Sequence, residues 1–390
     1  MERINKILFS VLRYTVCGEM LSEEVKNSLS PETLSALYRL SKKHDLAHLV
    51  ADALDKNGLL PKDDFISQKF LQQRVMAVYR YEQSNYELQE ISRIFEEEKI
   101  ENIPLKGSVL RAYYPQPWMR TSCDIDILVR QDEVKRAVKL LTEKYGYTYS
   151  IHTQHDYSLF SAGGVHIELH FILIFHDESG DDFTKRVWES AVAEDGFGYR
   201  KKLSNELFYG YHIAHIAQHI LQGGCGVKPF IDLKIMQEKM GIDRFCAQET
   251  LERCHLTTFA QRCEELAEVW FDGGEKSAAL TEFENYVLLG GVYGTLENKA
   301  QIGKSAKKGK FRYLLSRIFL PYRSLALMYP SLKKCPVLFP FYQVRRWFRL
   351  FHKNGVKVSD AVKELKTVSE VSEESGERAA ALLRDLGLKQ

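Results

Sequence analysis

The stretch IPLKGSVLRAYYPQPWMRTSCDIDILV, residues 103–129, decides the fold because two strand patterns flank a glycine turn in it. In its last part, Asp124 and Asp126 alternate with Ile125 and Ile127 at the two-residue period of a strand. Both carboxylates therefore project from one face, with Cα atoms roughly 7 Å apart. Two such charges repel each other unless a cation lies between them, and a divalent cation is the most direct partner.

The upstream part of this stretch predicts a turn that a phosphate can approach. Ile103–Leu105 is a short apolar strand pattern, and Val109–Tyr114 has the pattern of a helix start. Lys106, Gly107 and Ser108 lie between them. Glycine lets a phosphate come close to the backbone, and a helix start offers unpaired N–H groups. Strand, Gly-Ser turn and helix together predict an anion-binding arrangement.

A third carboxylate is expected on a later strand. Val165–Ile174 is an apolar strand pattern in which His166, Glu168 and His170 share one face. Glu168 is the candidate to join the two aspartates in a metal site. Two alternatives remain open: the acids can form a solvated face, or Glu168 and the two histidines can bind zinc. The zinc alternative leaves the two aspartates without a role.

These motifs resemble the uncharacterised bacterial nucleotidyltransferase family of the polymerase-β-like nucleotidyltransferase superfamily. The family pattern runs Leu-Lys-Gly, Tyr-Pro, Arg and Asp-Ile-Asp. The matching positions are Leu105-Lys106-Gly107, Tyr114-Pro115, Arg120 and Asp124-Ile125-Asp126. The motif block covers about 70 residues, and looser similarity in the flanking helical patterns extends over most of the chain.

The resemblance implies a reaction and assigns residues to it. Asp124, Asp126 and Glu168 would be catalytic and would hold two Mg²⁺ ions, with Mn²⁺ as an alternative. The residues expected to bind the nucleoside triphosphate are Lys106, Gly107, Ser108 and Arg120. The implied activity moves a nucleoside monophosphate group to a hydroxyl or amine of a small molecule, a protein or an RNA, and releases pyrophosphate. The rival hypothesis is a catalytically silent nucleotide-binding or RNA-binding module on the same scaffold.

The predicted fold class is α+β, with a small mixed β-sheet nucleotidyltransferase core flanked by N-terminal and C-terminal α-helical regions. A chain of 390 residues is long for one domain. We expect four regions, which are an N-terminal helical region, the core, a helical domain that closes the cleft, and a basic aromatic segment with C-terminal helices. Their bounds are 1–98, 99–197, 198–297 and 298–390.

Helical periodicity covers most of the chain outside the core. We expect helices where apolar residues recur at three- and four-residue spacing: Ile4–Val16, Leu34–Leu54, Phe65–Glu98, Leu203–Leu221 and Glu249–Trp270. In the third range, Val75, Tyr79 and Tyr86 fall on one face and Tyr81 and Leu88 on another. We expect this stripe to pack in the core, because an aromatic stripe at helical spacing is typical of buried positions.

A histidine stripe marks the helix expected over Leu203–Leu221. His212, His215 and His219 lie near one face of this helix. The stripe and the later Asp232 resemble the helical region of the family, which makes His215, His219 and Asp232 candidates for the substrate side of the cleft. The alternative is that the histidines are interior residues with satisfied hydrogen bonds.

The segment Asn298–Ser359 is basic and aromatic. It contains fifteen lysines and arginines and no acid. Aromatic residues interleave with these cations, which is typical of nucleic-acid binding. A basic surface over buried aromatics and attachment to an anionic membrane surface are the other two interpretations.

The composition indicates a cytoplasmic protein. Seven cysteines include no Cys-x-x-Cys pair, and an odd count is typical of reduced thiols. The N-terminal apolar run is too short and interrupted for a secretion signal, and no charge-free span reaches membrane length. A net charge of +2 says nothing decisive about partners.

Overall fold

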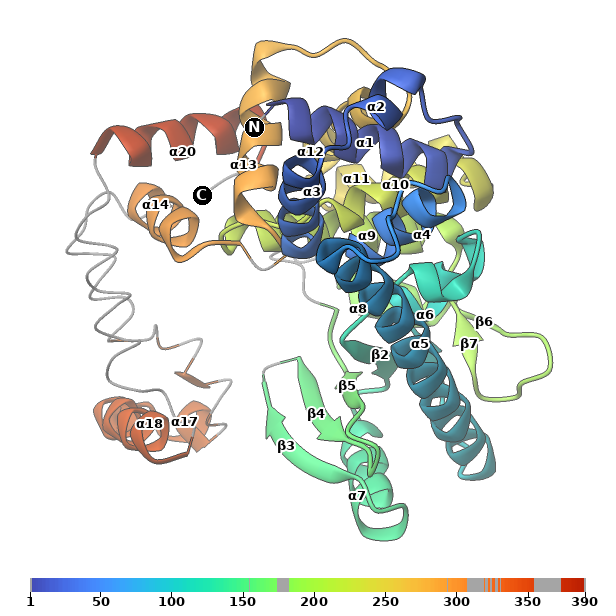
Figure 1. The fold of residues 1–390 in the computed structure, drawn as a ribbon. Coiled ribbons are helices and arrows are strands. Elements are labelled where there is room, and N and C mark those ends of the chain that lie inside the picture. The colour runs from blue at the N-terminus through green and yellow to red at the C-terminus, as the bar shows by residue number, and fades with distance from the viewer. Residues whose placement is uncertain are drawn as a thin grey trace. The chain divides into compact units, whose positions relative to one another are not determined.

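The computed structural model describes residues 2–153, 155–173, 182–292, 294–306, 331–353 and 373–388, with 319, 322, 325, 326 and 329. Figure 1 labels the helices and strands of this structure. The chain divides into two compact units. The first unit comprises Met1–Ile216 and Gly226–Glu284, and the second comprises Ala217–Cys225 and Asn285–Gln390.

The N-terminal region is helical. Its helices are α1 (Glu2–Cys17), α2 (Glu23–Asn27), α3 (Pro31–Lys43), α4 (Ala47–Lys56) and α5 (Phe65–Glu97). Ser30 caps α3 by accepting a hydrogen bond from the Thr33 N–H, and Pro31 is at the first helical position. The prediction of one continuous helix over Leu34–Leu54 is wrong, because Asp45 adopts a left-handed conformation with φ of 54° and separates α3 from α4.

The long helix α5 is exposed along one side, contrary to the prediction. Val75, Tyr79 and Tyr86, which were expected in the core, are 64%, 54% and 65% exposed. The buried face carries Leu88, the one residue of the predicted stripe that is buried as expected, together with Ala77. A helix of 33 residues is about 50 Å long, so it extends beyond the surfaces that it covers and leaves a stripe without neighbours.

A five-stranded mixed sheet follows α5. The strands are β1 (Asn102–Pro104), β2 (Asp124–Val129), β3 (Thr148–His152), β4 (Asp156–Phe160) and β5 (His166–His170), in the order β1-β2-β5-β4-β3. Only the central pair, β2 and β5, is parallel among the described pairings of this sheet. Helix α7 (Val134–Lys144) connects β2 to β3. The α+β prediction is confirmed.

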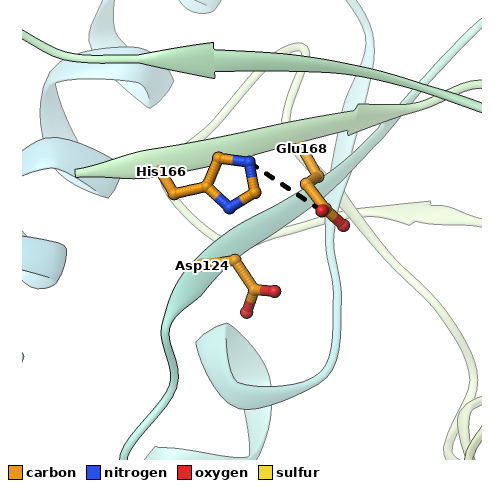
Figure 2. Close-up of side chains that lie close together, drawn as sticks. All are labelled: Asp124, His166 and Glu168. Atoms are coloured by element: carbon orange, nitrogen blue, oxygen red, sulfur yellow. Dashed lines mark ion pairs between the residues drawn. The ribbon is translucent and has the colours of Figure 1, made fainter. Parts of the chain in front are cut away.

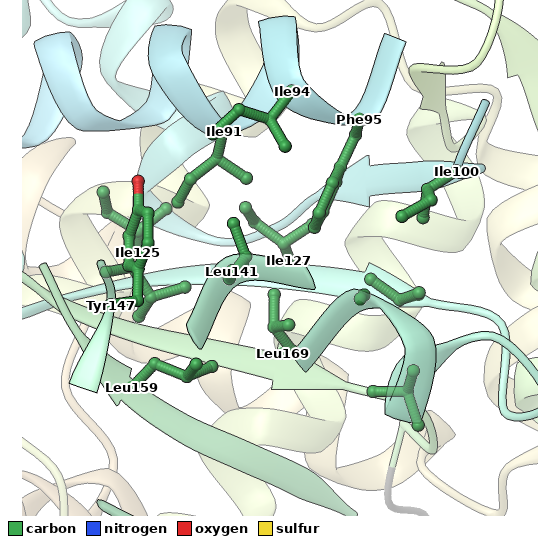
Figure 3. Close-up of a cluster of buried hydrophobic side chains, with 14 of the residues drawn as sticks. Ile91, Ile94, Phe95, Ile100, Ile125, Ile127, Leu141, Tyr147, Leu159 and Leu169 are labelled. Atoms are coloured by element: carbon green, nitrogen blue, oxygen red, sulfur yellow. The ribbon is translucent and has the colours of Figure 1, made fainter. Parts of the chain in front are cut away.

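One face of this sheet is the apolar core of the unit. Ile125 and Ile127 of β2 pack in one cluster with residues of β4, β5, α5 and α7 (Figure 3). Ile91 and Phe95 of α5 cover them, and Leu141 of α7 lies in the same cluster. Because side chains alternate across a strand, this burial fixes the direction of the intervening residues. Asp124 and Asp126 must therefore project from the opposite face.

The first unit continues with short strands and helices. They are α8 (Phe183–Ser190), β6 (Val192–Ala193), β7 (Lys201–Lys202), α9 (Asn205–Leu221), α10 (Lys228–Lys239), α11 (Arg244–Arg253), α12 (Thr257–Phe271) and α13 (Ala278–Gly290), of which α9 and α13 extend into the second unit. The prediction of one helix over Glu249–Trp270 is wrong, because His255 has a left-handed φ of 54° between α11 and α12.

The described part of the second unit is helical. It includes α14 (Leu296–Ala306), α17 (Ser331–Lys334), the 3-10 turn η3 (Pro336–Leu338), α18 (Phe339–Lys353) and α20 (Glu373–Asp385). Tyr329 and Tyr342 are buried and stack with ring centroids 4.7 Å apart. Arg345 lies over both rings.

Much of the basic aromatic segment 298–359 lies outside the described residues. These undescribed parts include Phe311 and Tyr313, and the side chains of Trp347 and Phe348. Within the described residues, no helix has the length and apolar character needed to cross a membrane.

Candidate functional site

The parallel pairing of β2 and β5 gathers the predicted carboxylates. Asp124 is the partner of His166, and Asp126 is the partner of Glu168. With alternating side chains, these four residues and His170 project from the face opposite the apolar core. Three acids from two strands that are about 40 residues apart in sequence thus converge on one surface.

Two groups of side chains on this face have metal-ligand spacing. One is Asp124, His166 and Glu168 (Figure 2), and the other is Asp126, Glu168 and His170. In each group, the ligand atoms lie within 4.8 Å of one another. Glu168 belongs to both groups, so it could bridge two cations. The acids of the magnesium hypothesis and the histidines of the zinc hypothesis therefore occupy a single cluster.

Asp126 is the buried member of the cluster and is already compensated. Its Oδ1 accepts hydrogen bonds from Lys106 Nζ at 2.8 Å and from His170 Nε2 at 2.8 Å. Burial alone would raise the pKa of Asp126, but the charges of Lys106 and His170 outweigh burial and hold the pKa well below its usual range. Burial and the charge of Lys106 would lower the pKa of His170, but hydrogen bonds to Asp126 and Glu168 outweigh them and raise it to about 9. At neutral pH, Asp126 is therefore ionised and His170 is protonated.

Asp124 has the opposite electrostatic environment. Burial and the neighbouring Asp126 raise its pKa to about 6, although Lys106 opposes them. Glu168 adds further repulsion, and Asp124 forms no ion pair with a lysine or arginine among the described residues. Asp124 is therefore a half-buried carboxylate crowded by two other acids, and a divalent cation would relieve this repulsion.

The glycine turn is packed more tightly than the sequence indicated. The expected helix over Val109–Tyr114 is only one turn, α6 (Gly107–Leu110), followed by the 3-10 turn η1 (Arg111–Tyr113). The backbone becomes extended at Tyr114, the residue before Pro115, because proline disfavours the helical conformation in the residue that precedes it.

The packing at Gly107 leaves little room for a side chain. A Cβ there would lie 3.3 Å from Ser122 Cβ and 3.6 Å from an Arg120 guanidinium nitrogen. The preceding Lys106 has a positive φ of 47°. Glycine is therefore favoured over larger residues at position 107 by the close approach to Ser122, which lies two positions before β2. Ser108 is half-buried.

Arg120 and Asp232 form a buried pair. Arg120 Nε donates to both carboxylate oxygens of Asp232, at 2.7 and 2.9 Å, and the Tyr114 hydroxyl donates to the same group at 2.6 Å. Burial would raise the pKa of Asp232, but the Arg120 charge lowers it. The structure thus brings together a residue predicted to bind nucleotide and one predicted for the substrate side, and it anchors the segment before β2 to α10.

A second set of contacts holds the same segment. Thr121 Oγ1 donates to Asp45 Oδ2 at 2.7 Å, and Lys228 Nζ donates to Thr121 Oγ1 at 2.9 Å and also bonds Asp45. His48 Nε2 donates to the Met119 carbonyl at 2.8 Å. Nothing in the sequence marked Asp45, His48 or Lys228, because their partners lie 71 to 183 positions away.

The histidine stripe of α9 is divided between the units. His212 is buried and donates to the Pro229 carbonyl at 2.8 Å, and burial lowers its pKa. His215 is half-buried, with its ring 6.2 Å from that of Tyr211. His219 lies in the second unit. The structure thus supports the interior interpretation for His212.

Tyr211 is a site residue that the sequence did not indicate. Its side chain is 6% exposed, and burial raises the pKa of its hydroxyl. The charges of Lys106 and of the three carboxylates on this face also shift the pKa of the Tyr211 hydroxyl, so Tyr211 lies close to the cluster. The signal that could have found it is its place one helical turn before His215.

Comparison with known proteins identifies the family. The sequence model of the family described as uncharacterised nucleotidyltransferase matches residues 30–272, which is more than half of the chain. This range includes β2 and β5, which form the carboxylate face, the sheet face that carries Asp124, Asp126 and Glu168. No curated protein and no solved structure matched the chain. The chain therefore belongs to this uncharacterised nucleotidyltransferase family.

Proposed function

We propose that this protein is a metal-dependent nucleotidyltransferase in which Asp124, Asp126 and Glu168 are the catalytic carboxylates. Family membership supports nucleotidyl transfer in general. The observation that carries the specific proposal is the β2–β5 register, which places the three acids on one face with ligand atoms of each group within 4.8 Å.

The donor atoms of this face fit divalent cations. Carboxylate oxygens are the preferred ligands of Mg²⁺ and Mn²⁺, and imidazole nitrogens are also accepted by Mn²⁺. Asp124 and Glu168 would hold one ion, and Asp126 and Glu168 a second. When bound, such ions neutralise the charge that develops on the transferred phosphoryl group.

The side chains of the chain have definite roles in this proposal. Lys106 and His170 keep Asp126 ionised, and Asp124, with a pKa of about 6, is largely ionised at neutral pH. Gly107 and Ser108 would approach the outer phosphates, and Lys106 and Arg120 would offset their charge.

In the proposed step, the acceptor oxygen or nitrogen forms a bond to the α-phosphorus. The bond between that phosphorus and the pyrophosphate oxygen breaks, so pyrophosphate leaves with the electron pair. Glu168 accepts the acceptor's proton, as a carboxylate at the reacting centre can do.

A silent nucleotide-binding module is the second candidate, and one observation favours it. Lys106 and His170 already satisfy Asp126, so a metal ion must compete with two cationic side chains for this carboxylate. A module that binds nucleotide through Lys106 without a metal would have the same contacts.

Transfer of a labelled α-phosphate separates the two candidates. The protein is incubated with each α-labelled nucleoside triphosphate, Mg²⁺ or Mn²⁺, and a panel of small alcohols, amines, proteins and tRNA. The transferase predicts label on an acceptor with an equal amount of pyrophosphate, and no label for Asp124→Asn. Nucleotide binding with no label on any acceptor would favour the module.

Three other expectations remain predictions. They are the cytoplasmic location, the substrate-side roles of His215, His219 and Asp232, and RNA binding by residues 298–359. The stacked Tyr329 and Tyr342 are buried, so among the described aromatics this pair supports packing more than base stacking.

A further inference from the structure

An apolar stripe is exposed on η3 and the first turns of α18. Its members are Val337, Leu338, Phe341 and Val344, which are 85%, 39%, 60% and 43% exposed. Leu338, Phe341 and Val344 follow one another at three-residue spacing, and η3 leads directly into α18, so they share one helical face. Single exposed apolar residues are ordinary on a protein surface, but four neighbours in one stripe form a patch.

The opposite side of this segment is already packed. Tyr342 is buried against Tyr329, with ring centroids 4.7 Å apart, and its hydroxyl lies 2.6 Å from Ser331 Oγ. Leu332 belongs to the same buried cluster. Even the polar Gln343 is buried, while its apolar neighbour Val344 is exposed. The segment therefore has a core of its own, and the apolar stripe lies outside it.

The apolar stripe is bordered by positive charge. Residues 331–353 contain six lysines and arginines and no acid. Arg345, the residue after the last member of the stripe, is exposed, and its guanidinium lies over the rings of Tyr329 and Tyr342 at 5.7 and 6.0 Å. Arg346 adds a second charge beside it. The surface thus combines aliphatic side chains with cations in a segment that has no acid.

An anionic lipid bilayer matches both parts of this surface. Its headgroups attract lysine and arginine, and the boundary with its acyl chains accepts apolar side chains. Nucleic acid would match the cations, but three of the four stripe residues are aliphatic and cannot stack on bases, and the described Tyr329 and Tyr342 are buried. A second copy of the chain would match the stripe, but its own cations would repel this segment.

The length of α18 determines how such a segment would bind. A helix of 15 residues is about 22 Å long, which is shorter than a hydrocarbon core of about 30 Å. We propose that η3 and α18 lie along the surface of an anionic bilayer, with the apolar stripe inserted below the headgroups and Arg345 and Arg346 at the level of the lipid phosphates. This inference goes beyond nucleotidyl transfer and does not depend on it.

The test measures co-sedimentation of the full-length protein with large unilamellar vesicles. The vesicles contain either phosphatidylcholine alone or phosphatidylcholine and phosphatidylglycerol in equal amounts. We expect the wild type to bind the anionic vesicles about 10-fold or more tightly than the neutral ones, and to bind less as salt screens the headgroup charge. No binding to the anionic vesicles at low salt would overturn the proposal.

The double variant Val337→Ser with Phe341→Ser tests the apolar stripe. We expect it to weaken binding to anionic vesicles about 10-fold, because two inserted apolar side chains are lost. The matched control is Val192→Ser with Phe245→Ser, which changes an exposed valine and an exposed phenylalanine of the first unit and should bind as the wild type does. All four side chains are exposed, so both melting temperatures should stay unchanged. If the stripe variant does not fold, Val344→Ser replaces it and should also weaken binding.

The double variant Arg345→Gln with Arg346→Gln tests the charge. We expect binding to anionic vesicles to weaken about 10-fold or more and to depend less on salt. Its control is Arg253→Gln with Arg378→Gln, two arginines that form exposed ion pairs on α11 and α20. This control should bind as the wild type does.

The outcomes separate the bilayer from other partners. Vesicle binding that needs both the apolar stripe and the arginines supports the proposal. Wild-type affinity in the stripe variant would mean that attraction is electrostatic alone, and it would overturn the proposal. Salt-dependent binding of single-stranded RNA without vesicle binding would assign the cations to nucleic acid instead. A dimer that the stripe variant abolishes, again without vesicle binding, would assign the stripe to a second copy, and either result contradicts the bilayer.

Discussion

Two buried aspartates of this protein look alike at first and differ in their surroundings. Asp126 and Asp232 are both almost inaccessible, and each accepts hydrogen bonds from a cationic side chain. Asp232 has Arg120 and the Tyr114 hydroxyl, and among the described residues it belongs to no group with metal-ligand spacing. Asp126 lies beside Asp124 and Glu168. Burial and a cationic partner are therefore common to both aspartates, and what makes Asp126 part of a candidate metal site is the pair of nearby carboxylates.

The largest expected effect on stability comes from neutralising Asp232, the acid of the buried Arg120–Asp232 pair. Asp232→Asn keeps the shape of the side chain but leaves the buried charge of Arg120 without a counter-ion. We expect the free energy of unfolding to fall by about 3–5 kcal/mol, as when one partner of a buried ion pair is removed. Urea denaturation measures this. A folded variant with wild-type stability that lost only acceptor turnover would instead assign Asp232 to the substrate side.

The two aspartates of the carboxylate face should respond in opposite directions. Asp126→Asn removes the partner of Lys106 and His170 and should lower the free energy of unfolding by about 1–3 kcal/mol. Asp124→Asn should leave it unchanged or raise it. The folded-state pKa of Asp124, about 6, is above its ordinary value of 3.8, so its ionised form opposes folding at neutral pH.

Thermal unfolding without divalent cations at pH 7.5 measures both variants. Destabilisation of Asp124→Asn as large as that of Asp126→Asn would mean that Asp124 has a stabilising partner, and the contrast between the two residues would fail.

Protonation of His48, which holds the segment before β2 through the Met119 carbonyl, should lower the free energy of unfolding by a smaller amount. Burial lowers the pKa of His48 to about 4 from an ordinary 6.5, so the unfolded chain binds this proton first as pH falls. The stability present above pH 6.5 is therefore lost between 6.5 and 4, with about 1 kcal/mol lost by pH 5.5.

His48→Gln is the control for this pH dependence, because glutamine can donate to the Met119 carbonyl and does not titrate. Urea unfolding of both proteins from pH 7.5 to 5 should show a shallower loss in the variant. Equal slopes would assign the acid sensitivity to other groups, such as His212.

The predictable part of this structure is the part determined by local pattern. Alternation of Ile125 and Ile127 with the aspartates determined both the strand and its polar face, and the same rule placed Glu168 correctly. The helix breaks at Asp45 and His255 were not predicted. A residue other than glycine that adopts the left-handed conformation does not change the spacing of the apolar residues around it, so the sequence pattern does not reveal the break.

Tertiary neighbours decided the remaining features. Tyr79 and Tyr86 are exposed, which shows that aromatic residues at helical spacing are buried only where another element packs against that face of the helix. Arg120 and Asp232 are 112 positions apart, so their pairing was not visible from spacing.

Electron paramagnetic resonance of Mn²⁺ reports directly on whether Asp124, Asp126 and Glu168 hold a divalent cation. Free Mn²⁺ is titrated against wild type, Asp124→Asn, Glu168→Gln and, as a control away from the carboxylate face, Asp45→Asn, each with a non-hydrolysable nucleoside triphosphate. We expect wild type and Asp45→Asn to remove Mn²⁺ from solution equally, after subtraction of binding by the nucleotide alone. Asp124→Asn and Glu168→Gln should lose this binding. Equal Mn²⁺ binding by all four folded proteins would contradict the assignment of a metal site to this face.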